Sequence, residues 1–87
     1  MAAGGAGRGA VLGPNVRPVV RDAIEKMRAG DNELNLSGKR LDTDDARVLA
    51  EELKVNASLT ELYLGDNQIG DAGAQALAEA LKVNASL

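Results

Sequence analysis

The side chains of this chain that could take part in chemistry all carry oxygen or basic nitrogen: carboxylates, lysines and arginines, three serines, two threonines and one tyrosine. The chain has no histidine and no cysteine, so it lacks the commonest general base and the thiolate nucleophile. The hydroxyl groups have no evident activating partner. Asp44 and Asp45 are adjacent on a predicted helix, so their carboxylates diverge and do not share a proton. The sequence therefore predicts a protein that is not an enzyme, with no catalytic residue and no cofactor.

The acidic run Asp42-Thr43-Asp44-Asp45 is the obvious place to look for a metal site. It lacks the glycine and the distal glutamate of a calcium loop. A helix dipole favours negative charge in the first turn, which explains the run without a ligand. No metal site is expected.

Two tripeptides, Asn56-Ala57-Ser58 and Asn84-Ala85-Ser86, match the acceptor for N-glycosylation. Two matches could indicate secretion. Both, however, lie in the segment LKVNASL, which occurs unchanged at residues 53–59 and 81–87. The two matches are therefore copies of one repeated segment and count as a single observation. No signal-peptide core is visible near the N-terminus. We interpret each as a helix-ending asparagine followed by a turn serine. Because the chain also lacks cysteine, we expect a reducing, cytoplasmic location.

Size and charge limit the partners. A chain of 87 residues forms one small domain, and without phenylalanine or tryptophan its core consists of Leu, Val, Ile and Ala. Residues 1–30 carry five basic and two acidic side chains, whereas residues 31–87 carry five basic and eleven acidic ones. An acidic body argues against nucleic acid as a partner, and the absence of an 18-residue apolar run argues against a membrane span. The basic N-terminal segment could equally dock on the acidic body.

The chain repeats itself with a period of 28 residues. Of the 27 pairs aligned between residues 33–59 and 61–87, 14 are identical, mostly at apolar positions and in the segment LKVNASL. A period of this length is typical of solenoid arrays, in which each unit buries its apolar side against the next. A segment that meets its own copy one layer away is held to one shape, which explains the unchanged LKVNASL.

Within each unit the pattern predicts a short strand followed by a helix. Leu62 and Leu64 alternate with Glu61 and Tyr63, as in a half-buried strand. Two apolar stripes with i, i+3, i+4, i+7 spacing predict one helix in each unit: Ala46, Leu49, Ala50 and Leu53, then Ala74, Leu77, Ala78 and Leu81. Asp42 or Thr43 is the predicted N-cap of the first helix, and Asp71 that of the second.

The segment L-T-E-L-Y-L-G-D-N-Q-I-G at residues 59–70 resembles the leucine-rich repeat, L-x-x-L-x-L-x-x-N-x-I-G. The period and the helix IGDAGAQALAEAL resemble the ribonuclease-inhibitor type, also found in NOD-like receptors. The resemblance implies an α/β fold: a short right-handed solenoid of about two strand-turn-helix units, with an asparagine, Asn67, whose amide satisfies backbone groups at the bend. Asp31 and Lys39 replace the leading leucine and this asparagine in residues 31–59, which we interpret as a degenerate first repeat. Residues 60–87 form the second.

In this family the strands line a concave face where ligands usually bind. Carried over to this sequence, the candidate protein-binding residues are Glu33, Asn35, Ser37, Glu61, Tyr63, Gly65 and Asp66. Tyr63 is the only aromatic residue; an exposed tyrosine is common in interface hot spots, but tyrosine is also a good strand former. Two strands offer far less than the ~800 Å² per partner of a standard interface.

The N-terminal residues divide into two parts. Residues 1–16, rich in Gly and Ala, are predicted to be a flexible leader. In residues 17–30, Val20, Ala23, Ile24 and Met27 predict an amphipathic helix that ends at Gly30. Such a basic helix could bind a membrane or a partner; we favour a cap on the first repeat, because an uncapped repeat leaves its core open.

The second repeat has no predicted cap. Five apolar residues are expected to be partly open on its C-terminal side: Leu62, Leu64, Ile69, Leu77 and Leu81. We therefore predict a protein-interaction module that binds itself, as a homodimer or larger assembly, and an unknown heterologous protein. The alternative is the N-terminal fragment of a longer or designed repeat protein, without a function of its own.

Overall fold

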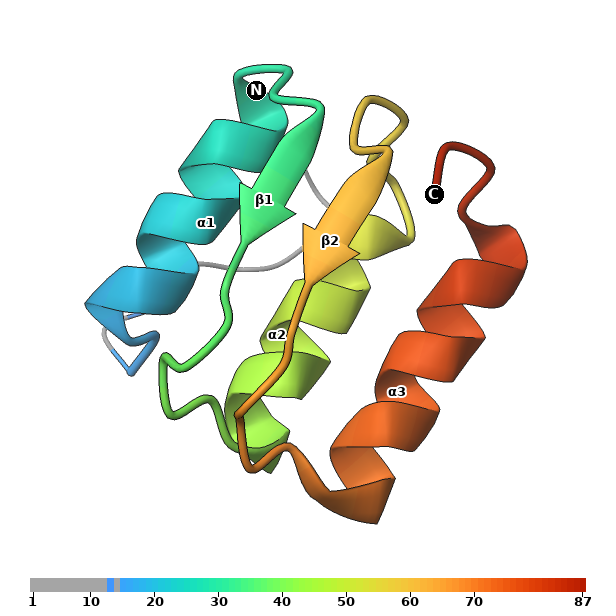
Figure 1. Cartoon of the computed structure of the whole chain (residues 1–87). Helices are drawn as coiled ribbons and strands as arrows, with labels where there is room; N and C mark the ends of the chain where they lie inside the picture. Colours follow the sequence, from blue (N-terminus) through green and yellow to red (C-terminus); the bar gives the residue numbers. More distant parts are fainter. Residues whose placement is uncertain (1–12, 14) are drawn as a thin grey trace.

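The computed structural model describes residue 13 and residues 15–87 (Figure 1). Its elements are, in chain order, α1 (Pro18–Arg28), β1 (Glu33–Asn35), α2 (Thr43–Leu53), β2 (Glu61–Tyr63) and α3 (Gly70–Val83). Most of the predicted leader, residues 1–12 and 14, lies outside the described residues. The observed order is a helix followed by two strand-turn-helix units.

The two strands pair in parallel. Glu33 lies opposite Glu61, Leu34 opposite Leu62, and Asn35 opposite Tyr63, so each residue meets the one 28 positions later. Parallel strands need a crossover, and α2 supplies it. In Figure 1 the strands lie side by side in front of α2, and none of the helices of residues 15–87 covers the face of the sheet turned to the viewer. The sheet thus has one helix-covered face and one exposed face.

Helix α2 begins where its sequence signals place it. The Asp42 carboxylate accepts a hydrogen bond from the backbone N–H of Asp45 (3.0 Å), and the Asp45 carboxylate accepts one from the N–H of Asp42 (3.0 Å). This reciprocal pair satisfies two donors that the first turn leaves free. Of the two predicted N-caps, Asp42 is therefore the one used.

The predicted N-cap of the second helix is wrong. Helix α3 starts at Gly70, Ile69 occupies its N-cap position, and no side chain caps it. Gly70 has φ +76°, a conformation that glycine adopts without strain, and the helix begins two residues earlier than an N-cap at Asp71 implies. Asp71 is therefore an acidic residue of the first turn, where it still favours the helix dipole.

Helix α1 buries the stripe predicted for it. Val20, Ala23, Ile24 and Met27 are each at most 1% exposed. They pack in one cluster with apolar residues of β1 and α2, among them Leu34, Leu49 and Leu53. The helix ends at Arg28, and Gly30 follows with φ +97°. The core thus lies between α1, the two strands and α2.

Helices α2 and α3 pack through small residues. Gly73 and Ala80 are the buried residues of α3. A Cβ added to Gly73 would lie 3.1 Å from the Cβ of Ala46 and 2.3 Å from Cγ2 of Ile69, so the close approach requires glycine at this position. None of the helices in the described part of the chain has the length and apolar content to cross a bilayer.

Candidate functional site

A hollow of about 460 Å³ lies beside β2 and α3 and reaches the last residue of α2, Leu53. We call its lining the open face. It consists of Leu53, Thr60, Leu62, Leu64, Leu77, Leu81 and Leu87. Six of these seven side chains are leucines and none is charged, so the open face is an apolar surface.

The first unit shows how such a surface is buried when a second unit packs against it. Leu34 and Leu36 of the first unit are 5% and 4% exposed, and Leu53 is fully buried. Their counterparts 28 residues later are Leu62, Leu64 and Leu81; the first two are half-buried and Leu81 is 50% exposed. The residues are of the same type, but the second unit is packed against another unit only on the side of the first. On the side of the open face, none of the described residues forms a further layer.

Four of the five predicted self-association residues line the open face: Leu62, Leu64, Leu77 and Leu81. Ile69 does not; it is half-buried against Gly73, on the side of α3 that faces α2. Sequence reasoning missed Leu53, Thr60 and Leu87. Leu87 could have been found from the repeat, because it is the copy of Leu59 at the end of LKVNASL. In the structure Leu59 is fully buried, whereas Leu87 is 39% exposed.

The repeated segment LKVNASL ties one unit to the unit before it. The Asn84 side chain donates from Nδ2 to the carbonyls of Leu53 and Asn56, both at 2.7 Å. Its Oδ1 accepts from the backbone N–H groups of Ser86 and Leu87. One amide therefore closes its own turn and binds the preceding one.

The copy one unit earlier makes the same kinds of contact. Asn56 Oδ1 accepts from the N–H groups of Ser58 and Leu59, and its Nδ2 donates to the carbonyl of Met27 at 3.1 Å. Both asparagines of the Asn-x-Ser matches thus use their Nδ2, the atom a glycan would occupy, in structural hydrogen bonds. This favours the turn interpretation of the motif.

The serines of the two segments add a second ladder. Ser58 Oγ lies 3.5 Å from the carbonyl oxygen of Asp31, and Ser86 Oγ donates to the carbonyl of Leu59 at 2.6 Å. Each serine reaches back 27 residues, to equivalent positions. The exact repetition of this segment therefore preserves a set of contacts and not merely a turn.

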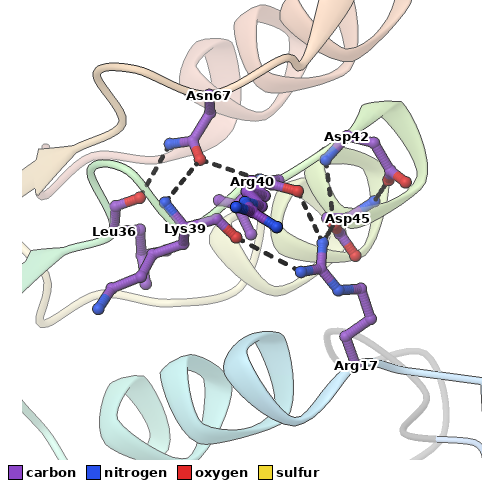
Figure 2. A network of polar contacts seen from close by, with 8 residues as sticks. Arg17, Leu36, Lys39, Arg40, Asp42, Asp45 and Asn67 are labelled. Carbon is purple, nitrogen blue, oxygen red and sulfur yellow. Dashed lines mark hydrogen bonds and ion pairs between the residues drawn. The ribbon is translucent and has the colours of Figure 1, made fainter.

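At the opposite bend, Asn67 acts as the resemblance implies. Its Nδ2 donates to the carbonyl of Leu36 (2.8 Å), and its Oδ1 accepts from the N–H of Lys39 (Figure 2). The same Nδ2 also donates to the carbonyl of Leu64 (3.0 Å), and the same Oδ1 accepts from the N–H of Leu41. One side chain thus satisfies groups in both units.

Arg17 holds the same bend from the other side. Its guanidinium donates to the carbonyl of Arg40 at 2.8 Å and to the carboxylate of Asp45, which is 6% exposed (Figure 2). Lys39 stands where the second unit has its asparagine, so the first unit lacks that donor. Arg17 contributes hydrogen-bond donors at this bend from outside the repeat.

A second ion pair fixes the other end of α1. Arg28 donates from Nη2 to Glu52 Oε1 at 2.9 Å, and Glu52 is only 3% exposed. The hydrogen bond with Glu52 raises the pKa of Arg28 above its ordinary value. The basic N-terminal segment thus docks on the acidic body through two arginines that neutralise two buried carboxylates.

The exposed face of the sheet carries the predicted concave-face residues. Glu33, Asn35, Glu61, Tyr63 and Asp66 are exposed, and Ser37 is half-buried. The Tyr63 hydroxyl donates to Glu61 Oε2 at 3.3 Å. The negative charges of Glu61 and, secondly, Glu33 raise the pKa of Tyr63 above 10.0. Glu33 and Glu61 lie opposite each other, and neither is in an ion pair within the described residues.

A smaller and more polar hollow of about 300 Å³ lies between α1 and β1. Asp22, Lys26, Glu33, Asn35 and Lys39 contribute polar groups to its lining. Its mixture of acidic and basic side chains selects no ligand class. In the described part of the chain no three acidic side chains come close enough together to hold a metal ion.

The comparisons with known proteins agree with the repeat geometry. Residues 55–78, which contain β2 and most of α3, match the family model of the leucine-rich repeat. No curated protein matches the chain. The matched segment begins in LKVNASL and includes Asn67, the residue that ties the two bends together. Residues 55–78 are therefore similar to a leucine-rich repeat.

Proposed function

We propose that this protein is a non-catalytic protein-interaction module that associates with itself through the open face of its second repeat. The fold is a short solenoid of two repeats of the ribonuclease-inhibitor type, and α1 is its N-terminal cap. The observation that carries the proposal is the hollow beside β2 and α3, whose lining is apolar and uncharged.

The physical reason is the difference between the two ends of the array. At the first end, α1 buries the four residues of its apolar stripe to 1% exposure or less. At the second end, the hollow remains and Leu81 is half exposed. Burying apolar surface releases about 25 cal/mol per Å², so the second end gains free energy from any apolar surface of matching shape. Proteins with leucine-rich repeats generally bind other proteins, which points to a protein as the partner.

Light scattering after size-exclusion chromatography, run over a range of concentrations, tests the proposal. The unaltered chain is expected to dimerise as its concentration rises. Leu81→Glu places a charge on the open face and is expected to keep the chain monomeric. Val83→Glu is the matched control, because Val83 is on the same helix and 62% exposed but does not line the hollow. A monomeric unaltered chain at every concentration, with α-helical circular dichroism, would contradict the proposal.

The second candidate is a structural role as the N-terminal part of a longer array. The hydrogen bonds of Asn84 and Ser86 favour it, since each binds the unit before and could be repeated by a following unit. Adding a second copy of residues 60–87 after Leu87 tests this function. The longer chain is expected to unfold at a higher temperature, because the added unit covers the open face. An added unit that gave no further α-helical signal would argue against it.

A further inference from the structure

We propose that two copies join through the open face about a two-fold axis that runs perpendicular to the sheet beside Tyr63. In this dimer β2 pairs antiparallel with β2 of the second copy, and α3 packs against its α3. The inference rests on the proposed self-association and specifies its geometry. It accounts for the unpaired edge of β2 and for the hollow at once.

The first step is that, among the described residues, the second end of the array offers an apolar surface and the first end does not. Helix α1 lies against β1 and α2, and its apolar stripe is buried. A head-to-tail contact would have to seat the open face of one copy on the polar outer surface of α1 in the next. Arg21, Asp22, Glu25 and Lys26, all on α1, are at least partly exposed. The open face therefore meets its own equivalent, which requires a two-fold axis.

The second step fixes the direction of the axis. The hollow lies between the sheet layer and the helix layer, so it closes only if both layers continue into the second copy. An axis along the strands would place the two α3 helices on opposite faces of the joined sheet. An axis perpendicular to the sheet keeps both helices on one face. That axis makes the two β2 strands antiparallel.

The third step concerns the backbone of β2. Glu61 donates its N–H to the carbonyl of Asn32, and the Tyr63 carbonyl accepts from the N–H of Leu36, so these two residues face β1. Because successive residues of a strand point to opposite edges, the N–H groups of Leu62 and Leu64 face away from β1. The sheet of the described residues has two strands, so this edge has no strand beside it. An added strand would supply partners for both groups.

The fourth step chooses the register. If the axis passes beside Tyr63, Leu62 lies opposite Leu64 of the second copy and exchanges both backbone hydrogen bonds with it. Glu61 then lies opposite Gly65, and the two Glu61 residues are four positions apart, roughly 13 Å. If the axis passed beside Leu62, the two Glu61 residues would be diagonal neighbours at about 7–8 Å, and Leu64 would meet Thr60. An axis beside Tyr63 is therefore favoured, because it keeps the two Glu61 charges apart and pairs Leu62 with Leu64.

Cysteine cross-linking tests the geometry, because the natural chain contains no cysteine. Tyr63→Cys should form a covalent dimer under mild oxidation, since the paired Cα atoms would lie about 4.5 Å apart, within the range of a disulfide. Asn35→Cys is the matched control: Asn35 is exposed and lies directly opposite Tyr63 on β1. In the dimer the two Asn35 positions would be roughly 14 Å apart, three strand spacings. Glu61→Cys should not cross-link either.

The outcomes separate the geometry from the association itself. Cross-linking of Tyr63→Cys, but not of Asn35→Cys or Glu61→Cys, supports the proposal. A dimer seen by light scattering in which Tyr63→Cys does not cross-link overturns the geometry but leaves the proposed function standing. Equal cross-linking of Asn35→Cys also overturns the geometry, because it would indicate contact through the exposed face of the sheet. A chain that stays monomeric at every concentration overturns both.

Discussion

The side-chain amide of Asn84 donates a hydrogen bond of 2.7 Å to the main-chain carbonyl of Asn56, its own counterpart one repeat earlier. The same amide binds the carbonyl of Leu53, at the end of α2. Because each copy of LKVNASL binds its predecessor, a change in this segment disturbs two units at once. The repeated segment therefore carries a contact that joins the two units.

The first prediction concerns this ladder. Asn56→Ala removes the acceptor for two backbone N–H groups and the donor to Met27, all partly buried. Losing three such bonds should lower the free energy of unfolding by about 2–3 kcal/mol, measured by urea denaturation. Asn15→Ala is the control, because Asn15 is exposed and none of the side-chain hydrogen bonds seen in the described residues involves it. Equal stability of the two variants would contradict a structural role for the ladder.

The second prediction concerns the contact between α2 and α3. Gly73→Ala would place a methyl group 2.3 Å from Cγ2 of Ile69 and 3.1 Å from the Cβ of Ala46. Alanine is the better helix former, but the forced separation should outweigh this and lower the free energy of unfolding by about 1–2 kcal/mol. Gly65→Ala meets only Ser37 Oγ at 3.8 Å and is expected to be tolerated. A stabilised Gly73→Ala variant would show that the helices are not in close contact.

The third prediction concerns the tie between α1 and the first repeat. Arg28→Ala leaves the carboxylate of Glu52, which is 3% exposed, without its guanidinium partner. The expected loss is about 2–3 kcal/mol in the free energy of unfolding. Lys26→Ala breaks an ion pair whose two side chains are both more than half exposed, and should cost under about 0.5 kcal/mol. If both substitutions cost the same, α1 is not anchored by Glu52.

The fourth prediction is a pH dependence at the N-cap of α2. The hydrogen bond from the Asp45 N–H is the main cause that holds the pKa of Asp42 below 3.8. A carboxylate whose pKa is lower in the folded state stabilises the protein above its unfolded pKa, and this contribution is lost as pH falls through the folded pKa. Thermal unfolding between about pH 5 and pH 2 should therefore show the stability gap between the unaltered chain and Asp42→Asn shrinking with acidity.

A matched variant checks that the effect belongs to the cap. Asp42→Ser keeps an oxygen that can accept from the Asp45 N–H but carries no charge, so its stability should show the same loss of acid dependence as Asp42→Asn. If the stability difference between the unaltered chain and Asp42→Asn stayed constant with pH, the charged carboxylate of Asp42 would not be the group that stabilises the start of α2.

The fifth prediction concerns the exposed face of the sheet. Tyr63 is the only tyrosine and the chain has no tryptophan, so its ultraviolet titration is free of overlap. Because the Glu61 charge is the largest cause of the raised pKa of Tyr63 and the Glu33 charge the second, Glu61→Gln should lower that pKa toward 10.0 more than Glu33→Gln does. Glu79→Gln, on α3, should leave it unchanged. An unchanged titration of Glu61→Gln would contradict the observed proximity of the two side chains.

The sequence predicts the elements of this fold well because its apolar spacing is regular. The stripe of Val20, Ala23, Ile24 and Met27 is buried in α1 as expected, and Asn67 binds backbone groups at the bend. The N-cap of α3 was predicted wrongly because the left-handed φ of Gly70, and not a polar side chain, sets the start of that helix. A glycine in such a position is not visible in the apolar spacing.

Four leucines of the candidate site were predicted from the sequence, but its full extent was not. Leu62, Leu64, Leu77 and Leu81 follow from periodicity, whereas Leu53 reaches the hollow from the first repeat, and Thr60 and Leu87 reach it from the two ends of the second. Likewise, Arg17 lies 28 residues from Asp45, and no local pattern joins them. Contacts between layers depend on the three-dimensional arrangement of the units, which the period of the repeat alone does not specify.

Amide hydrogen exchange at Leu62 and Leu64, followed by nuclear magnetic resonance over a range of protein concentrations, tests the central claim most directly. Their N–H groups point to the free edge of β2, so their exchange should slow as the chain associates. The N–H of Leu36, already bonded to the Tyr63 carbonyl at 2.8 Å, should be protected at every concentration. Rapid exchange of Leu62 and Leu64 in a sample that is fully associated would contradict the account.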